Sequence, residues 1–369
     1  MRKISVLVAD DSAFMRKVLS DILNSDEDIE VIGTAKDGIE AVELVQKLSP
    51  NVVTMDVEMP RMDGLEAVKK IMEIKPTPIL MVSALTRKGS EATFKALEYG
   101  AVDFIEKPSG SISLDIRKIG NEIINKVKSV SKAVVRKKQH IAREPTTEKV
   151  EKLGDKKTLP VESEFVGELN IPPEKLKKMA VMIGSSTGGP PVVSEIIAML
   201  PKDMPPIFVV QHMPQGFTKM FAERMNDRSK LNVKEAQDGE LVKPGHVYVA
   251  PGDYQMILKK RGDDVYIELD NHMPKVHGTR PTVDITAEHV AKIYGKNTVG
   301  VILTGIGRDG AYGMKQIRDR GGHTIAQKEE TCVVFGMPKA AIEMGAIELV
   351  LPPSKIPENI VKFIKLIGG

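Results

Sequence analysis

The sequence predicts an α/β protein with parallel sheets in two domains, and three observations lead to this fold class. Short apolar runs alternate with amphipathic stretches along most of the 369 residues, a pattern typical of strands and crossover helices. The strand candidates are continuous β-branched runs, which indicates burial on both faces of a sheet. The length suits two domains of roughly 100–200 residues each.

Residues 1–125 contain five strand–helix repeats. Strands are expected at residues 4–9, 30–35, 52–57, 79–83 and 102–106, and the helices that follow them at 12–23, 38–48, 64–74, 91–99 and 112–127. Ser12 stands directly before the first amphipathic stretch, where an N-cap is needed. Five such units predict a compact, doubly wound domain with a five-stranded parallel sheet.

The alternation resumes on a larger scale in residues 178–369. Strands are expected at 180–183, 207–211, 246–250, 299–303, 323–327 and 347–351, and helices at 190–200, 216–228, 282–294, 310–319 and 338–343. Residues 256–258 and 265–268 flank a polar turn and predict a β-hairpin. The second domain is therefore expected to be α/β with an antiparallel addition.

Residues 126–177 are expected to form a basic linker. The stretch 126–157 carries 11 Lys/Arg against 4 Asp/Glu, although the net charge of the chain is only +3. It has no aromatic side chain to stack on bases, so the charge run predicts a solvated linker rather than a nucleic-acid contact. The chain has no apolar run near the roughly 20 residues that span a bilayer, and no signal peptide is expected. The single cysteine, Cys332, rules out an internal disulfide and suits a reducing cytoplasm.

Polar residues stand at the carboxyl ends of the first domain's strands, where ligands bind in open α/β sheets. Asp10 and Asp11 follow the first strand, Asp56 ends the third, Ser83 ends the fourth, and Lys107 follows the fifth. Three carboxylates this close repel one another unless a divalent cation is bound, and oxygen ligands select Mg²⁺ or a similar hard ion. With a lysine and a hydroxyl beside them, they predict a carboxylate that accepts a phosphoryl group.

On these residues the first domain resembles a two-component receiver domain. The resemblance implies a flavodoxin-like fold, phosphorylation of Asp56 by a histidine kinase, and phosphate sensing by Ser83 and Lys107. It further implies that Asp11, Asp56 and the backbone carbonyl of Glu58 hold Mg²⁺, and that Asp10 assists through water. The family often has Thr and Tyr where this chain has Ser83 and Phe104, and Ser keeps the hydroxyl.

The second domain opens with Gly184-x-Ser186-x-Gly188 between a predicted strand and a predicted helix. Such a turn can hold out a nucleophilic serine, and the N–H groups at the start of the helix can bind an oxyanion. The spacing selects Ser186 over Ser185. The same pattern also suits a turn that merely caps a helix, so the motif alone leaves both readings open.

A base and an orienting acid can be sought at the same sheet edge. Among seven histidines, only His212 directly follows a predicted strand. His272 and His277 lie in a loop whose place the sequence does not fix. Asp309 follows strand 299–303, so three strand ends offer Ser, His and Asp.

A rival interpretation rests on Gly305-x-Gly307-x-x-Gly310, which follows a strand and has Glu329 about twenty residues on. This is a dinucleotide-binding fingerprint. It leaves Ser186 and His212 without a role, and for that reason it is the weaker interpretation.

Residues 178–369 resemble the catalytic domain of the chemotaxis protein-glutamate methylesterases, on residues 183–189, 211–214 and 303–310. The resemblance implies a phosphorylation-controlled serine hydrolase with a Rossmann-like domain, no cofactor in that domain, and Ser186, His212 and Asp309 as the triad. Thr187 and Ile306 are expected near the oxyanion or the substrate, and Ile306 stands where Met is common.

The implied reactions are hydrolysis of glutamate methyl esters and deamidation of glutamines on the cytoplasmic helices of methyl-accepting chemoreceptors, with no nucleic acid and no membrane insertion. The unphosphorylated receiver is expected to cover the Ser186 edge. A competing class, a regulator that binds DNA through the basic run 126–143, predicts a basic helix-turn-helix output domain, whereas the output domain here is α/β.

Overall fold

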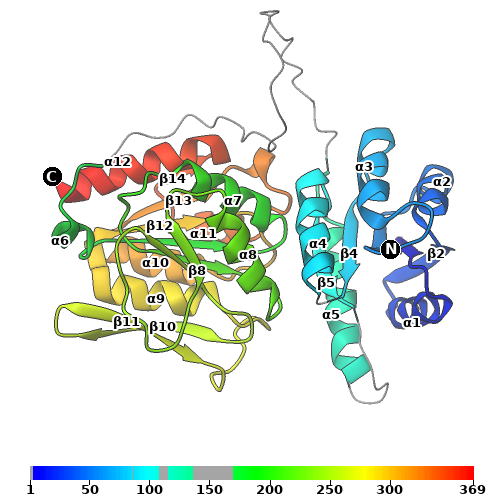
Figure 1. Cartoon of the computed structure of the whole chain (residues 1–369), viewed down its shortest axis with the longest axis horizontal. Helices are drawn as coiled ribbons and strands as arrows, with labels where there is room; N and C mark the ends of the chain where they lie inside the picture. Colours follow the sequence, from blue (N-terminus) through cyan, green and yellow to red (C-terminus); the bar gives the residue numbers. More distant parts are fainter. Residues whose placement is uncertain (1–2, 85, 108–114, 136–168) are drawn as a thin grey trace, which may run out of the picture.

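The computed structural model describes residues 3–84, 86–107, 115–135 and 169–369. Figure 1 shows two α/β domains in contact, the N-terminal one in blue and cyan and the C-terminal one in green to red. Among the described residues no helix is both long enough and apolar enough to cross a membrane.

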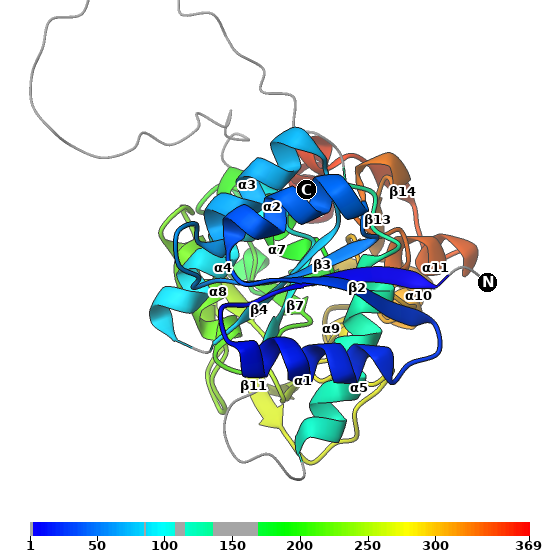
Figure 2. The same ribbon diagram turned by 90° about the vertical axis from the view of Figure 1, so that its right-hand side faces the viewer.

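The N-terminal domain has the five-stranded parallel sheet that the sequence predicts, and its strand order is β2-β1-β3-β4-β5. Its elements are β1 (Ile4–Ala9), α1 (Ala13–Asn24), β2 (Ile29–Ala35), α2 (Gly38–Leu48), β3 (Val52–Asp56), α3 (Gly64–Ile74), β4 (Ile79–Ser83), α4 (Arg87–Tyr99), β5 (Asp103–Glu106) and α5 (Asp115–Val130). Ser12 caps α1 as expected, accepting a hydrogen bond from the Met15 N–H. Figure 2 shows α2 and α3 on one face of this sheet and α1 and α5 on the other.

The C-terminal domain is a seven-stranded parallel sheet in the order β14-β13-β12-β6-β7-β9-β8, and β10 and β11 form an antiparallel hairpin. Its elements are α6 (Pro173–Leu176), β6 (Ala180–Ser185), α7 (Gly189–Met199), β7 (Ile207–Gln211), α8 (Phe217–Asn226), β8 (Asn232–Glu235), β9 (His246–Val249), β10 (Gln255–Arg261), β11 (Asp264–Asp270), α9 (Val283–Tyr294), β12 (Thr298–Ile302), α10 (Ala311–Asp319), β13 (His323–Gln327), α11 (Met337–Glu343), β14 (Leu349–Leu351) and α12 (Ile356–Gly368). The central strands β6, β7 and β12 are buried throughout, because helices cover both faces of the sheet.

The structure differs from the sequence-based expectations in several elements. Edge strand β8 and helices α6 and α12 were not predicted, and α4 begins four residues before the expected start at 91. Helix α5 ends at Val130, three residues beyond the expected end at 127. Two lysines of the basic run lie in this helix and form ion pairs within the N-terminal domain. Lys126 pairs with Asp103, and Lys128 pairs with Asp26 and Asp28. Residues 136–168 of the expected linker lie outside the described part of the chain.

A cluster of four phenylalanines joins the two domains. Phe94 of α4 and Phe104 of β5 meet Phe217 and Phe221 of α8. The Phe104 and Phe217 ring centroids lie 4.5 Å apart, and Phe94 stacks on Phe221 at 5.9 Å. All four side chains are almost fully buried, so one hydrophobic core runs through both domains.

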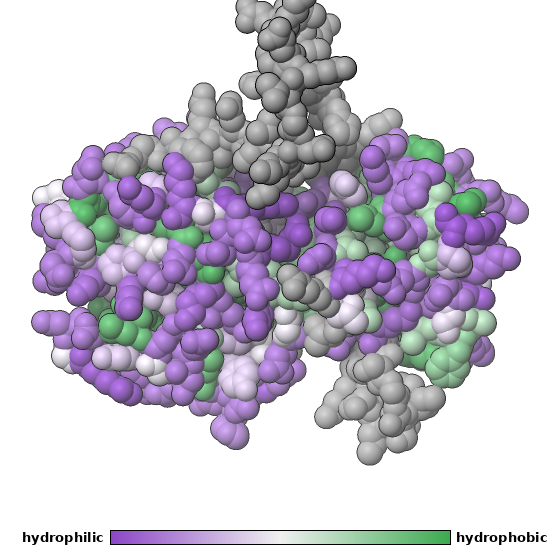
Figure 3. All heavy atoms as spheres, in the orientation of Figure 1, coloured by the Kyte–Doolittle hydropathy of each residue, from purple (hydrophilic) through white to green (hydrophobic). Residues whose placement is uncertain are grey.

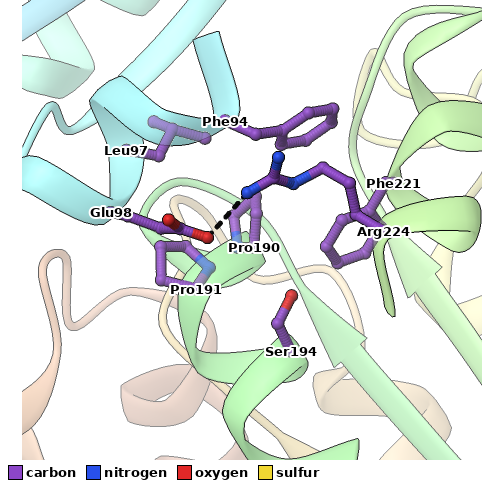
Figure 4. A pocket seen from close by; sticks show the side chains of 8 residues that line it. All are labelled: Phe94, Leu97, Glu98, Pro190, Pro191, Ser194, Phe221 and Arg224. Atoms are coloured by element: carbon purple, nitrogen blue, oxygen red, sulfur yellow. Dashed lines mark hydrogen bonds and ion pairs between the residues drawn. The ribbon is translucent and has the colours of Figure 1, made fainter. Parts of the chain in front are cut away.

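Charged groups lie at the edge of the same contact between the two domains. Figure 4 shows Arg224 of α8 reaching Glu98 of α4, beside Pro190 of α7. The Arg224 guanidinium lies 2.7 Å from Glu98 Oε1 and 5.6 Å from the centre of the Phe94 ring. Arg228 approaches the same carboxylate oxygen at 2.6 Å. Elsewhere the face drawn in Figure 3 is mainly hydrophilic, with scattered hydrophobic residues.

Candidate active site and phosphoacceptor cluster

The carboxyl ends of β1, β3 and β5 bring a lysine and three acids together. Lys107 Nζ lies 2.7 Å from Asp56 Oδ2 and 2.9 Å from Asp10 Oδ2. The carboxylate oxygens of Asp10, Asp11 and Asp56 lie within 4.8 Å of one another. Asp10 and Asp56 are buried, and Asp11 is exposed at the mouth of the cluster.

Electrostatics in this cluster are unbalanced, because one ammonium group serves two buried carboxylates. Burial raises the pKa of Asp56, and the charge of Asp10 adds to the rise, while Lys107 offsets only part of it. Burial lowers the pKa of Lys107, but its bonds to Asp10 and Asp56 outweigh that effect and raise the pKa overall. Asp10 Oδ2 is buried, and it pairs with the same Lys107 ammonium group that bonds to Asp56. A hard divalent cation suits such a set of oxygens.

The other predicted residues of this cluster stand slightly apart. Ser83 ends β4 beside Lys107, whose backbone N–H donates to the Ser83 carbonyl. The Ser83 hydroxyl donates a hydrogen bond to the Ala84 carbonyl at 3.3 Å. The Glu58 side chain points outward to Lys88, at 3.2 Å, so only its backbone carbonyl could serve a bound cation.

In the second domain, the turn after β6 holds two serines in different environments. The Ser185 hydroxyl is fully buried and donates to Gln211 Oε1 at 2.6 Å. Ser186 keeps 8% of its surface exposed, and its Oγ has no hydrogen bond to any described residue. Gly188 follows at φ 75°, a left-handed conformation that glycine adopts without strain. Ser185 is thus tied into the sheet, and Ser186 is the free hydroxyl of the pair.

The imidazole of His212 and the carboxylate of Asp309 meet across the ends of β7 and β12. His212 Nε2 lies 2.8 Å from Asp309 Oδ2. Asp309 also accepts hydrogen bonds from the N–H groups of Val283 (2.8 Å) and Asp284 (3.0 Å) at the start of α9. Burial alone would raise the pKa of Asp309, but these three hydrogen bonds and the charge of His212 together lower it. The acid therefore stays ionised, and because it binds Nε2, the other nitrogen Nδ1 is free to face a nucleophile.

A second loop brings backbone N–H groups to Ser186. Gly305 packs so closely that a β-carbon there would lie 2.8 Å from Ser186 Cβ. The next residue is Ile306, and neither its N–H nor that of Thr187 donates to another described residue. The N–H group of Thr187, next to Ser186, and that of Ile306, next to Gly305, thus remain available as donors, and an oxyanion site needs such donors.

Sequence reasoning gave no role to two residues around this site, although one of them belongs to the 211–214 motif. Gln211 precedes His212 and holds the serine turn through Ser185 and the Ser186 carbonyl. Thr279 Oγ1 lies 3.5 Å from His212 Nε2, on the loop whose place the sequence did not fix. Only Gln211 carried a signal in the sequence, because it ends a predicted strand.

The receiver domain contacts the turn that carries Ser186. The Gly188 N–H donates to the Val102 carbonyl at 3.1 Å, and the Thr187 hydroxyl donates to Asp103 Oδ2 at 2.6 Å. Asp103 Oδ2 also pairs with Lys126 Nζ at 2.7 Å. Thr187 is 2% exposed in this arrangement. The start of β5 therefore lies directly on the residues that follow Ser186.

The fold and these two clusters are those of a response regulator whose output domain is a hydrolase. Comparison with known proteins agrees: residues 6–117 match the response regulator receiver domain, and residues 181–360 match the CheB methylesterase family. The chain belongs to the family of protein-glutamate methylesterases/protein-glutamine glutaminases with an N-terminal receiver domain. This membership sets aside the dinucleotide-binding interpretation of Gly305, Gly307 and Gly310.

Relatives of that name match along the whole chain. The protein of Methanococcus maripaludis is 63% identical over 100% of both chains. That of Thermotoga maritima is 47% identical over 98% of this chain and 99% of its own length. A crystal structure of the catalytic domain of Thermotoga maritima CheB methylesterase is 52% identical, with a TM-score of 0.49, and covers 50% of this chain and 97% of its own.

Proposed function

We propose that this enzyme removes methyl groups from glutamate methyl esters on the cytoplasmic helices of chemoreceptors, releasing methanol, and converts certain receptor glutamines to glutamate. It works in the cytoplasm and serves adaptation in chemotaxis, with a histidine kinase as phosphodonor. The relatives' names support the two reactions, and the receiver domain supports control by phosphorylation.

Ser186, His212 and Asp309 form the catalytic triad. Ser186 Oγ attacks the side-chain carbonyl carbon, and His212 takes the serine proton and then gives it to the departing methoxide or ammonia. Water hydrolyses the acyl-enzyme by the same path in reverse. The 2.8 Å contact between His212 Nε2 and Asp309 is the observation that carries this proposal, because it fixes the tautomer that leaves Nδ1 free as the base. The N–H groups of Thr187 and Ile306 stabilise the oxyanion.

Replacement of each serine in turn tests the triad. We expect Ser186→Ala to abolish methanol release from a methylated receptor and Ser185→Ala to retain it, with a loss of stability because Gln211 would lose its partner. Normal turnover by Ser186→Ala, with loss in Ser185→Ala, would show that the nucleophile is Ser185. A fluorophosphonate that labels serine nucleophiles provides a second readout independent of the receptor.

Asp56 accepts the phosphoryl group, and Ser83 and Lys107 bind its oxygens. Asp11, Asp56 and the Glu58 carbonyl hold Mg²⁺, and Asp10 assists through water. The three clustered carboxylates, two of which share the single ammonium group of Lys107, support this assignment. Bound Mg²⁺ supplies positive charge where the negative charge of the phosphoryl group develops. Mass spectrometry after treatment with acetyl phosphate should find the modification on Asp56, and a phosphoryl group on Asp10 or Asp11 instead would refute the assignment.

The unphosphorylated receiver restrains the hydrolase by covering the turn that carries Ser186. The bonds from Gly188 to Val102 and from Thr187 to Asp103 support this role, because the receptor must reach the same turn. Deletion of residues 1 to about 145 should raise basal esterase activity and remove its dependence on a phosphodonor. A truncated enzyme no faster than the unphosphorylated whole would mean that the receiver activates or docks instead.

A further inference from the structure

Next to the proposed triad lies a buried carboxylate that the reaction does not use. Asp284 stands in the first turn of α9 and is 8% exposed. Its Oδ1 accepts a hydrogen bond from the Gly313 N–H of α10 at 2.7 Å, and its Oδ2 faces His277 Nε2 at 3.3 Å. A buried carboxylate is costly unless hydrogen bonds or an opposite charge compensate for the lost water.

Asp309 and Asp284 each accept hydrogen bonds from the start of the helix that lies beside the other acid. Asp309 precedes α10 and accepts the N–H groups that begin α9, whereas Asp284 belongs to α9 and accepts an N–H in the first turn of α10. Each carboxylate thus satisfies donors that the start of an α-helix leaves without a partner. The exchange links the two helices at the point where Asp309 meets His212.

Close packing reinforces the link. A β-carbon on Gly313 would lie 2.5 Å from Ala287 Cβ of α9, so the two helices touch through backbone at this level. Since the N–H groups of α9 define where the Asp309 carboxylate sits, any shift of α9 against α10 moves that carboxylate relative to His212. The Gly313–Asp284 hydrogen bond restrains such a shift.

The environment of Asp284 disfavours a charge on it. Burial raises the pKa of Asp284 and the charge of Asp309 raises it further, while the Gly313 N–H and His277 oppose the rise in part. The hydrogen bond from the Gly313 N–H is thus one of the two contacts that stabilise the carboxylate in this position.

From this geometry we infer that Asp284 is a positioning residue of the esterase, which fixes the Asp309 carboxylate against His212 through α9 and α10. The inference rests on the proposed triad. It assigns no contact with the substrate to Asp284, so the effect of its replacement should fall on kcat rather than on KM.

The test compares Asp284→Ala and Asp284→Asn in the full chain. Alanine removes both the hydrogen-bond acceptor and the charge, and we expect kcat to fall about 100-fold, because misplacement of about 1 Å has that effect, with KM nearly unchanged. Asparagine keeps an acceptor for the Gly313 N–H, although a neutral one that bonds less strongly than a carboxylate, so kcat should recover to within about tenfold of the wild type, with KM again nearly unchanged.

Glu288→Gln is the matched control, since Glu288 is an exposed acid on the same helix. It should keep the wild-type kcat and KM. Wild-type kcat in both Asp284 variants would overturn the inference, as would an equal loss in both or a loss that falls mainly on KM. If Asp284→Ala does not fold, Asp284→Asn decides alone: a lowered kcat with unchanged KM supports the inference, and a wild-type kcat or a raised KM overturns it. Activity that persists in Ser186→Ala would instead refute the proposed triad, so the two failures are distinguishable.

Discussion

The contact between Arg224 and Glu98 offers a direct test of whether the receiver restrains the hydrolase. Arg224 lies in α8, away from Ser186 in sequence, and bridges to α4 of the receiver domain. Arg224→Ala removes the ion pair with Glu98 and the contact with the Phe94 ring, and leaves both proposed sites untouched. We expect the variant to shift the population toward open forms, in which the receptor reaches the catalytic turn.

The size of the effect follows from the exposure of the partners. The side chains of Arg224 and Glu98 are 21% and 36% exposed, so solvent screens the ion pair and its contribution is about 0.5–1 kcal/mol. The cation–π contact at 5.6 Å contributes a further ~0.5–1 kcal/mol. A total of about 1–2 kcal/mol corresponds to a change of about five- to thirtyfold in the ratio of open to closed forms.

Two assays of the unphosphorylated full chain measure this change. Methanol release from a methylated receptor should rise by about five- to thirtyfold, and stimulation by a phosphodonor should shrink by the same factor. The rate of Ser186 labelling by a small fluorophosphonate should rise as well, which separates access to the site from receptor binding. Arg261→Ala is the matched control, because Arg261 also lies over an aromatic ring, that of Tyr266, in the β10–β11 hairpin.

A basal rate and labelling rate within twofold of wild type, in a folded Arg224→Ala protein, would refute the reasoning. The interface between α4 and α8 would then be a packing contact without influence on access. A rise in methanol release without faster labelling would mean that Arg224 obstructs the receptor itself rather than holding the receiver in place.

Three further predictions concern the two sites and the helix pair. Asp309→Asn should reduce turnover about 10⁴-fold in steady-state assays, since the amide can donate to His212 Nε2 and so favours the wrong tautomer. Millimolar Mg²⁺ should raise the Tm at pH 7 and raise it less at pH 5. The reason is that the pKa of Asp56 is raised, so protons compete with the cation at a higher pH than they would for an ordinary aspartate. Asp56→Asn should respond to neither Mg²⁺ nor beryllofluoride. Gly313→Ala should cost about 1–3 kcal/mol in urea unfolding, because the added methyl group would overlap Ala287; an unchanged midpoint would contradict the close packing of α9 and α10.

Most of the fold could be predicted because buried parallel strands are continuous apolar runs. Of the elements that were not predicted, strand β8 lacks that signal, whereas helix α12 carries an apolar pattern with helical spacing. Strand β8 has the sequence Asn-Val-Lys-Glu and lies at the sheet edge, where polar side chains are tolerated. Helix α12 does carry apolar residues at helical spacing, with Ile356, Ile360 and Ile364 all buried, so the sequence did contain the evidence for it.

The candidate site was predictable to the extent that strand ends determine it. Ser186, His212 and Asp309 follow three neighbouring strands of one parallel sheet, and the carboxyl ends of such strands share an edge. The roles of Asp103 and Asp284 could not be predicted in the same way. Asp103 belongs to the other domain, and Asp284 is positioned by the packing of α9 against α10, which no local pattern specifies.

Strand β5 connects the two sites directly. Its start bears Val102 and Asp103, which hold the turn after Ser186, and Lys107 at its other end holds Asp56. Four residues of extended chain span only about 13 Å. Between them Phe104 packs on Phe217 of the hydrolase, so a displacement of this strand alters the aromatic contact and the polar contact together. Phosphorylation of Asp56 would add negative charge beside Lys107. Within the described residues, β5 adjoins that lysine and also contacts the aromatic cluster and the turn that carries Ser186.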